Sequence, residues 1–600
     1  MKMNDQPRVK VRVCVEWIAM VLLCVYFANF FSNMISPQRQ LFLDTDSLNQ
    51  SSSVMAFVYK ENPQTLTADG ENNYAGEIDV NGKSYHLNVT TSGAEIQSCF
   101  VNGKAQKLIP IKRYTISQYY YNTFCVDLPI TDSHKMLWAG ALFFAFSWLL
   151  CKIRQEVRKS EDGLAVLTYS GTAVKAIGRK PIIVSFVVAL VSAGIFYGCD
   201  LQVISESIVM WQKGIDIYQL DACINSYKNM ELYMWQYEGA MLAGYGLPSY
   251  LSYPFLTFFR PDHYHWIQSI EYKLINMLLI NGTVLSVLSF LLDKGLIRSR
   301  QAKLVYYFSV FNPMIFWIAI IFIQFDMLPI YLVTLGVLLI SKARQEPITA
   351  AFFLGYGISC KVTELMFFPS ICLLLVSLFF AYKGCRKEIL RLMTGFIIIV
   401  TVLMLLPRTL ETPIKLAFHA LPQANRIWYT FFPYITNAVY LYVAIAGLIF
   451  AFMHSALTWN VRGSLEEHLI KTLLMLGIIT FVFSSLTIST PSFYLTALPS
   501  FVILSSRCEN AYELFLKNVF SILIVVCFLF GPVGDVTATL QFFGKQPIFS
   551  PVFRLAEEAG ISVQWNSLLF TISVASMWVY IKVFSSTLSR TRIVDNVVEM

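Results

Sequence analysis

The sequence predicts an all-α polytopic membrane protein of about fourteen transmembrane helices, with a small β-rich domain inserted between the first two. Three observations support this fold class. Hydrophobic residues make up 56% of the 600 residues and charged residues only 14%, against about 25% charged in a typical soluble domain. Nearly uncharged runs of about 18 residues or more recur along the chain. The short loops between them are rich in Lys and Arg on one side, which is typical of cytoplasmic loops.

The first two segments differ sharply in composition. Residues 1–36 join a short basic stretch to an apolar run, which predicts a cytoplasmic N-terminus and a signal-anchor helix. Residues 37–134 are polar, and the Asn-Gly pairs that begin at Asn81 and Asn102 are flanked by alternating segments, which is typical of β-hairpins. We therefore expect a β-rich extracytoplasmic accessory domain, in which a disulfide between Cys99 and Cys125 is one alternative.

The rest of the chain divides into three predicted parts. Residues 135–180 predict a transmembrane helix and a cytoplasmic loop, and residues 181–506 predict a transmembrane core with an outer loop at 200–271. Residues 507–600 predict C-terminal transmembrane helices and a cytoplasmic tail. Strict alternation places the basic loops and both termini in the cytoplasm. The net charge of +8 comes largely from those loops, so no nucleic-acid partner is expected.

Two carboxylates fall at the predicted outer surface of the membrane. Asp200 directly follows the apolar run 181–199, and Asp326 lies in a short outer turn after Asn312-Pro313. An ionisable group at a membrane boundary is costly unless it has a use. Two carboxylates on one face could act together as a base and an orienting group. The alternative for Asp326 is an N-cap of the following helix.

Several cations are predicted on the same outer side. Lys361 lies near the outer end of the predicted span 348–366, where it could bind a phosphate or pair with Glu364 at i,i+3 spacing. Arg408 and Arg426 lie in an outer segment, against the usual distribution of basic residues. They could hold an anionic lipid head group, and ordinary solvated charges are the alternative.

Polar and aromatic side chains complete the candidate binding residues. Flat rings with polar tips suit a sugar or lipid site, whereas an interfacial aromatic belt is the alternative. His263 and His265 offer too few ligands for a metal site. No phosphate-binding or dinucleotide motif is visible, so no cofactor is predicted, and a divalent cation has no support. The further substrate-binding candidates are Gln324, Tyr218, Tyr253 and Tyr494.

Two segments resemble a known enzyme family. The longer one is FNP followed by QFDMLPIYLVTLGVLLISKARQEPITAAFFLGYGISCKVTELMFFP. It is similar to the NP…GQFD-x-LP…K pattern of bacterial polyprenol-phosphate-mannose-dependent mannosyltransferases and related GPI-anchor mannosyltransferases. Asp200 and the turn Gly214-Ile215-Asp216-Ile217-Tyr218 resemble polytopic glycosyltransferases of the GT-C type. The resemblance covers residues 181–506, and Ile323 replaces the glycine that usually precedes QFD.

The resemblance implies a membrane hexosyltransferase, with mannose as the first candidate sugar. The donor would be a polyprenyl-phosphate-linked sugar, and the acceptor an extracytoplasmic glycan or lipid. Asp200 would act as general base, while Asp326 and Gln324 would orient hydroxyl groups. The cations that would stabilise the leaving phosphate are Lys361, Arg408 and Arg426.

Membrane lipid is a further expected partner, since the apolar helices would hold the prenyl tail. The expected location is the cell membrane, or the endoplasmic reticulum membrane in a eukaryote, with an extracytoplasmic active site. Three alternatives remain at this point: a lipid-linked polysaccharide polymerase or ligase with a lipid-pyrophosphate donor, a lipid-linked saccharide flippase or other transporter, and a non-catalytic scaffold.

Overall fold

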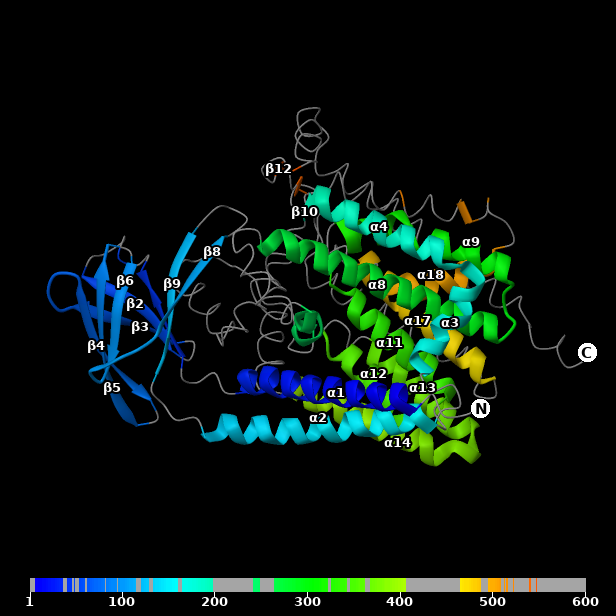
Figure 1. The fold of residues 1–600 in the computed structure, drawn as a ribbon, viewed down its shortest axis with the longest axis horizontal. Coiled ribbons are helices and arrows are strands. Elements are labelled where there is room, and N and C mark those ends of the chain that lie inside the picture. Colours follow the sequence, from blue (N-terminus) through cyan, green and yellow to red (C-terminus); the bar gives the residue numbers. More distant parts are fainter. Residues whose placement is uncertain are drawn as a thin grey trace, which may run out of the picture. The chain divides into compact units, whose positions relative to one another are not determined.

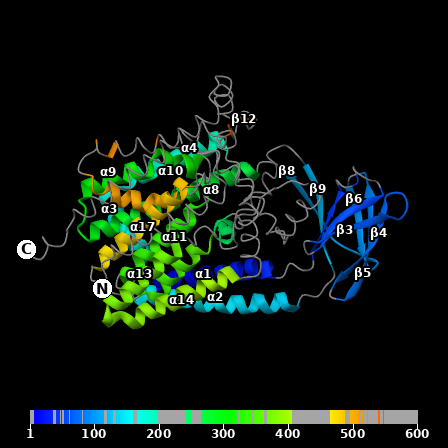
Figure 2. The same ribbon diagram turned by 180° about the vertical axis from the view of Figure 1, so that it is seen from behind.

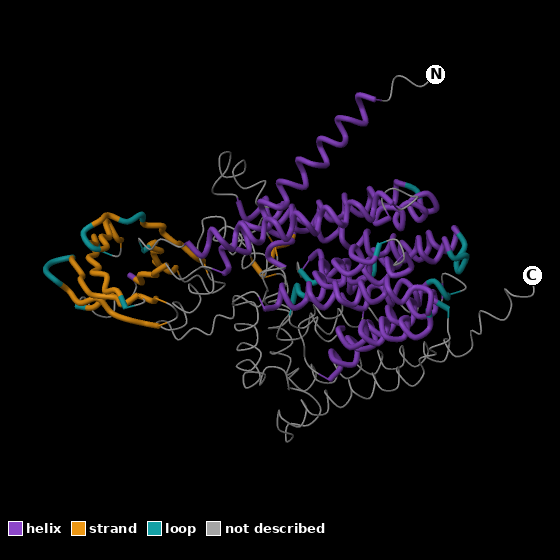
Figure 3. Tube along the Cα trace, turned by 90° about the horizontal axis from the view of Figure 1, so that it is seen from below, coloured by secondary structure: helices purple, strands orange, loops and turns teal. Residues whose placement is uncertain are grey.

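The computed structural model divides the chain into two compact units. The sheet unit contains Met1–Cys151, Val203–Tyr253 and Leu405–Leu416, and the helical unit contains Lys152–Gln202, Pro254–Met404 and Ala417–Met600. The residues that the structure describes are 6–35, 40–45, 48, 53–59, 62–80, 82–93, 95–114, 120–128, 133–159, 165–197, 241–248, 264–321, 325–342, 346–361, 367–405, 464–486, 495–508, 512, 514–515, 522, 539–540 and 546–547. In Figure 3, the strands of the curled sheet are orange and the helices are purple.

A nine-stranded antiparallel sheet fills most of the described sheet unit (Figure 1). Its spatial order is β7-β6-β5-β4-β3-β2-β1-β9-β8. The edge strands β7 and β8 are joined by only two residues, so the two edges lie within roughly 10 Å of each other. The sheet therefore curls toward closure. Its strands are β1 (Gln40–Asp44), β2 (Val54–Tyr59), β3 (Asn62–Ala68), β4 (Asn73–Val80), β5 (Lys83–Ser92), β6 (Glu95–Val101), β7 (Lys104–Ala105), β8 (Leu108–Tyr114) and β9 (Tyr120–Asp127).

The predicted Asn-Gly hairpins are confirmed. The turn between β6 and β7 consists of Asn102 and Gly103, whose φ angles are 49° and 72°. The turn between β4 and β5 carries Gly82 at a φ of 76°. Two-residue hairpin turns that match the twist of the strands need positive φ, which Asn and Gly adopt at little cost. The local sequence thus determined both turns.

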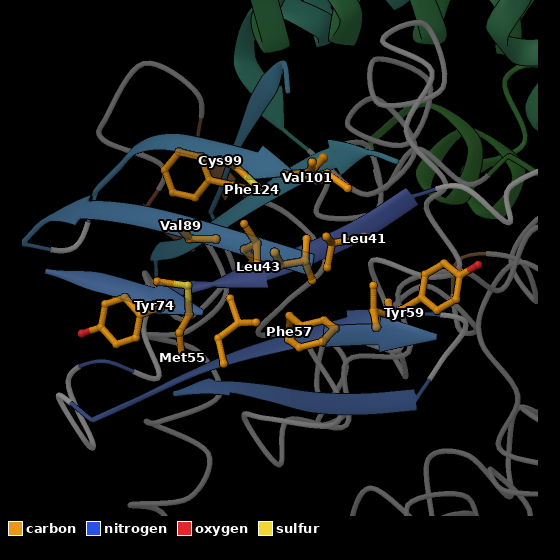
Figure 4. Packing of buried hydrophobic residues seen from close by; sticks show 14 of the residues in the cluster. Leu41, Leu43, Met55, Phe57, Tyr59, Tyr74, Val89, Cys99, Val101 and Phe124 are labelled. Atoms are coloured by element: carbon orange, nitrogen blue, oxygen red, sulfur yellow. The ribbon is translucent and has the colours of Figure 1, made fainter. Parts of the chain in front are cut away.

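The core of the sheet explains why the disulfide alternative is wrong. Cys99 is buried in the cluster that also contains Phe57 and Phe124 (Figure 4). Phe124 and Val126 of β9 both belong to this cluster. Successive side chains of a strand point to opposite faces, so Cys125 projects from the other face. No disulfide joins Cys99 and Cys125.

Helices α1 and α2 pack through aromatic rings in the sheet unit. Phe27 and Phe31 of α1 stack on Phe146 of α2, with ring centroids 5.3 and 5.8 Å apart. The buried Tyr26 hydroxyl donates to the carbonyl of Ala243 at 2.8 Å. This bond ties α1 to a short helical stretch of the predicted outer loop. The helical segments of this unit are α1 (Gln6–Ile35), the first part of α2 (Ser133–Lys159) and residues 241–248.

The helical unit is organised around α8, which packs against α3, α4, α9, α11 and α18. Figures 1 and 2 show α11 beside α8 from opposite sides. A small antiparallel sheet joins the end of α4 to a late part of the chain, in the order β10-β11-β12. The elements are α3 (Ala165–Ile177), α4 (Arg179–Ile195), β10 (Phe196–Tyr197), α8 (Tyr264–Asp293), α9 (Ser299–Val310), α10 (Pro313–Phe316), the π-helix η3 (Trp317–Ile321), α11 (Met327–Leu339), α12 (Pro347–Ile358), α13 (Phe368–Ala381), α14 (Arg386–Leu405), α17 (Leu465–Leu486), α18 (Leu498–Ser505), β11 (Thr539–Leu540) and β12 (Gln546–Pro547).

The predicted fold class is wrong. Within the described residues, three helices are long and apolar enough to cross a membrane: Cys14–Ser32, Met136–Arg158 and Ser269–Asp293. Two further pairs, bent by 94° and 44°, raise the number to five if each pair is one span. The chain is also not all-α, because it contains the nine-stranded sheet. About fourteen spans is therefore not the architecture found.

Helix length accounts for the error in the number of spans. Helices α11, α12 and α13 contain 13, 12 and 14 residues. At about 1.5 Å per residue they fall short of the roughly 30 Å hydrocarbon layer. Pro347 begins α12, and Pro369 lies in the first turn of α13. Pro is favoured in the first turn of a helix, so each of these prolines marks the start of a new short helix. A hydropathy sum over an apolar run does not show that a helix starts there.

Helix α3 was not predicted from the sequence, in which residues 135–180 indicated one span and a loop. The chain bends by 94° between α3 and α4. Gly178 lies at this bend with a φ of 88°, a backbone conformation that other residues rarely adopt. Helix α3 has only 13 residues, so a search for full-length spans passes over it.

Apolar side chains are exposed on the long helices. On α2, Leu137, Phe144 and Trp148 are 70%, 73% and 60% exposed. Ile18 and Leu22 are similarly exposed on α1. Contiguous exposed apolar faces are unusual on soluble proteins and suit contact with lipid. The chain therefore carries helices that can span a membrane by length, composition and surface.

Helices α11 and α12 approach closely through glycine. A Cβ added at Gly336 would lie 2.6 Å from Leu354 Cγ and 2.8 Å from the Leu354 backbone nitrogen. On the other helix, a Cβ at Gly357 would lie 2.8 Å from a methyl carbon of Val333. Contact at these distances requires a residue without a side chain. The pair of glycines therefore sets the spacing between α11 and α12.

We expect Gly336→Ala to lower the free energy of unfolding by about 1–3 kcal/mol, because the two helices must move apart. Thermal unfolding of the purified protein in one detergent measures this change. Gly140→Ala on α2 is the control, since no atom lies within 4 Å of its added Cβ. Equal stability of the two variants would contradict the close-packing argument.

Candidate functional site

Asp326 lies at the first turn of α11, in the N-cap position. Its backbone has φ −70° and ψ −4°, and its side chain makes no capping hydrogen bond. The residue is 2% exposed. The alternative of a side-chain N-cap is therefore wrong, and the carboxylate has another partner.

That partner is Lys361. Its Nζ donates to Asp326 Oδ1 at 2.9 Å, and the two side chains are 10% and 3% exposed. Helix α12 ends at Ile358, so Lys361 follows the helix instead of lying within a span as predicted. Because α11 and α12 are consecutive and joined by a short loop, the start of one and the end of the other meet. Two predicted site residues are thus brought together.

The second carboxylate oxygen of Asp326 is buried and has no hydrogen-bond partner among the described residues. Burying a carboxylate is expensive, and one ion pair offsets only part of the cost. Buried polar atoms in folded proteins nearly always find a partner, so this oxygen calls for one. A hydroxyl group of a bound ligand is a suitable donor. Asp326 can therefore orient such a hydroxyl or accept its proton.

The segment just before Asp326 is fixed against α8. The rings of Tyr272 and Phe325 meet edge to face, with centroids 5.3 Å apart. Asn276 Nδ2 donates to the carbonyl of Ala319 at 2.8 Å. Ala319 lies in η3, and π-helical turns are common near functional sites. Helix α8 therefore holds the chain on the N-terminal side of the ion pair.

The Asn312-Pro313 pair starts the helix that leads to this turn. Asn312 Oδ1 accepts from the backbone nitrogens of Met314 and Ile315 at 3.0 and 3.2 Å. Pro313 occupies the first turn, where its missing N–H costs nothing. The sequence pattern therefore has a local physical reason, which is to restart the helix after the break that follows α9.

Lys273 of α8 was not singled out from the sequence. It is fully buried, and its Nζ donates to the carbonyls of Ser192 and Phe196 at 3.0 and 2.6 Å. Its ammonium also lies 6.0 Å from the centre of the Phe196 ring. A lysine inside an apolar helix was the signal that could have identified it.

All the other predicted site residues lie outside the described residues. This holds for Asp200, Tyr218, Tyr253, Gln324, Arg408, Arg426 and Tyr494, and for His263. The backbone of His265 belongs to α8. The described part of the chain contains no group of three or more His, Cys, Asp or Glu side chains that could hold a metal ion. The candidate site therefore rests on Asp326 and Lys361.

Comparison with protein-family models, with curated proteins and with solved structures finds no match to this chain.

Proposed function

We propose that this chain is a membrane glycosyltransferase that moves a hexose from a polyprenyl-phosphate donor to a glycan or lipid acceptor. Mannose is the first sugar to test. The observation that supports the proposal is the buried pair of Asp326 and Lys361, which leaves one buried carboxylate oxygen without a partner among the described residues. This pair lies in the segment that resembles polyprenol-phosphate-mannose-dependent mannosyltransferases.

Lys361 receives a revised role in this proposal. Its ammonium already pairs with Asp326 Oδ1, so it holds and orients that carboxylate instead of binding the donor phosphate. The fixed carboxylate presents Oδ2 to a sugar hydroxyl. Orientation of this kind matters, because a misplacement of about 1 Å can cost roughly 100-fold in rate.

The proposed reaction uses Asp200 as the general base. The acceptor oxygen attacks the anomeric carbon and loses its proton to Asp200. The bond between the anomeric carbon and the phosphate oxygen breaks, and the electron pair leaves with the lipid phosphate. Arg408 and Arg426 stabilise the charge on that phosphate. Tyr218, Tyr253, Tyr494 and Gln324 remain proposed contacts of the sugar and lipid.

The proposal also assigns a compartment. Helices that can span a membrane would hold the prenyl tail, and the exposed apolar faces of α1, α2 and α4 support contact with lipid. The active site would face away from the cytoplasm, with both termini inside. The membrane would be the cell membrane, or the endoplasmic reticulum membrane in a eukaryote.

The test is sugar transfer by the purified full-length protein in lipid nanodiscs. Polyprenyl-phosphate hexoses, with mannose first, are supplied with a panel of glycan and lipid acceptors. We expect transfer by the wild type and a rate lower by about 10²–10⁴-fold for Asp200→Asn, because the general base is lost. Asp216→Asn, in the same segment, is the matched control and should transfer like the wild type.

Other outcomes would replace the proposal. Unchanged transfer by Asp200→Asn would remove that residue from the role of base. Reaction with polyprenyl-pyrophosphate donors alone would favour a polymerase or ligase. Movement of a lipid-linked saccharide across the bilayer without transfer would favour a flippase.

A further inference from the structure

The C-terminal end of α4 is held by a buried lysine from another helix. The last carbonyl groups of a helix have no partner within it and together carry a partial negative charge. In α4, the Ser192 carbonyl accepts from the Phe196 N–H and from Lys273 Nζ. The Phe196 carbonyl accepts from Lys273 as well. Lys273 therefore supplies a cap from outside α4.

No carboxylate among the described residues forms an ion pair with Lys273. The contrast with Lys361 is direct, since Lys361 is paired with Asp326. Burying an amine for two carbonyl groups is costly, and an apolar residue could fill the same space at lower cost. What the amine does in this position is hold two carbonyl groups at the end of α4.

The held segment is the one that leads to Asp200. Phe196 and Tyr197 form β10, whose partner β11 pairs Phe196 with Leu540 and Tyr197 with Thr539. Asp200 follows Tyr197 by three residues in the sequence. The start of this segment is thus fixed on one side by Lys273 and on another by β11.

The same helix also contacts the segment of Asp326. Tyr272, next to Lys273 in the chain, packs its ring on Phe325, which precedes Asp326. Helix α8 is therefore in contact with both the end of α4 and the turn before α11. A rigid element with two such contacts can set the spacing between the end of α4 and the turn before α11.

We propose that Lys273 is a positioning residue that fixes the end of α4, from which the chain continues in sequence to Asp200. This inference rests on the proposed function for its consequence in catalysis. Its structural part, the capping of α4 by Lys273, is measurable without any sugar transfer.

The first measurement is backbone hydrogen exchange of the full-length protein in nanodiscs. Lys273→Met keeps the length of the side chain and removes its hydrogen bonds. We expect the Phe196 and Tyr197 amides to exchange at least about tenfold faster than in the wild type. Lys273→Arg keeps donors for both carbonyls and should restore much of the protection. Unchanged exchange in Lys273→Met would overturn the capping role.

The second measurement is transfer. We expect Lys273→Met to lower kcat by about 10- to 100-fold with KM nearly unchanged, and Lys273→Arg to recover part of it. Asn281→Leu is the matched control, because Asn281 also joins α8 to α4, through Ser185 at 3.0 Å, far from the end of α4. An equal fall in kcat for Asn281→Leu would mean that any lost contact between α8 and α4 has the same effect. That result would overturn the inference.

A double variant separates the remaining explanations. If Lys273 acts through Asp200, Lys273→Met should cause little further loss in the Asp200→Asn background. A full further loss there would overturn the proposed link. If the wild type transfers no sugar from any polyprenyl-phosphate donor, the proposed function fails, while the exchange experiment still decides whether Lys273 caps α4.

Discussion

Replacing Lys361 by Met should lower the free energy of unfolding by about 3–5 kcal/mol. The substitution leaves the Asp326 carboxylate buried with its cation removed, and Asp326 Oδ2 already has no partner among the described residues. An uncompensated charge in a poorly polarisable interior is among the most destabilising changes a single substitution makes. Chemical or thermal unfolding of the purified protein measures the loss.

An exposed ion pair provides the control for this experiment. Lys294 Nζ lies 2.6 Å from Glu466 Oε1, but the two side chains are 39% and 33% exposed. Water screens such a pair, so Lys294→Met should cost about 1 kcal/mol or less. The double variant Asp326→Leu/Lys361→Met removes both buried charges and should regain much of the lost stability. A Lys361→Met variant as stable as Lys294→Met would contradict the claim that the buried Asp326 carboxylate depends on Lys361.

The second large effect is expected in the sheet. Phe57→Ala should destabilise the sheet by about 3–5 kcal/mol, because its ring is buried in the core (Figure 4) and Ala leaves a cavity. Phe57 is 1% exposed and lies on β2, opposite Leu43 of β1. Phe100→Ala on β6 is the control, since that ring is 36% exposed and lies outside the core cluster.

Cys99 provides the measurement for this prediction. Burial raises the pKa of the Cys99 thiol to about 12, so in the folded sheet it is both covered and protonated. A thiol reagent should reach it only when the sheet opens. Labelling of the Cys99 peptide, followed by mass spectrometry, should be at least roughly 100-fold faster in Phe57→Ala. A similar acceleration of Cys99 labelling in Phe100→Ala would contradict the claim that burial of the Phe57 ring stabilises the sheet.

The sequence predicts structure best where that structure depends only on neighbouring residues. The Asn102-Gly103 turn formed because two adjacent residues adopt positive φ, and Gly82 adopts positive φ in the other hairpin. The helix start at Asn312-Pro313 is just as local, since its bonds span only three residues, but it was not predicted. The apolar composition of α1, α2 and α8 identified helices that can span a membrane.

The prediction was wrong where the outcome depends on distant parts of the chain. Glu364, the helical neighbour that the sequence offered to Lys361, lies outside the described residues, and the ion pair that the structure shows joins Lys361 to Asp326, 35 residues away. The number of spans was overestimated because apolar runs do not reveal how long each helix continues. The disulfide alternative was wrong because Cys125 points to the face of the sheet opposite to that of Cys99. The face to which a side chain points depends on the alignment of its strand.

The sequence by itself determined the hairpin turns, the apolar helices α1, α2 and α8, and two carboxylates of interest. These features depend on the conformational preferences of neighbouring residues and on total hydrophobicity. Only the tertiary structure decided that Asp326 pairs with Lys361 and that Lys273 caps α4. The physical reason is that a buried charge finds its partner through helix packing, which Gly336 and Gly357 set for α11 and α12, and no local pattern records that choice.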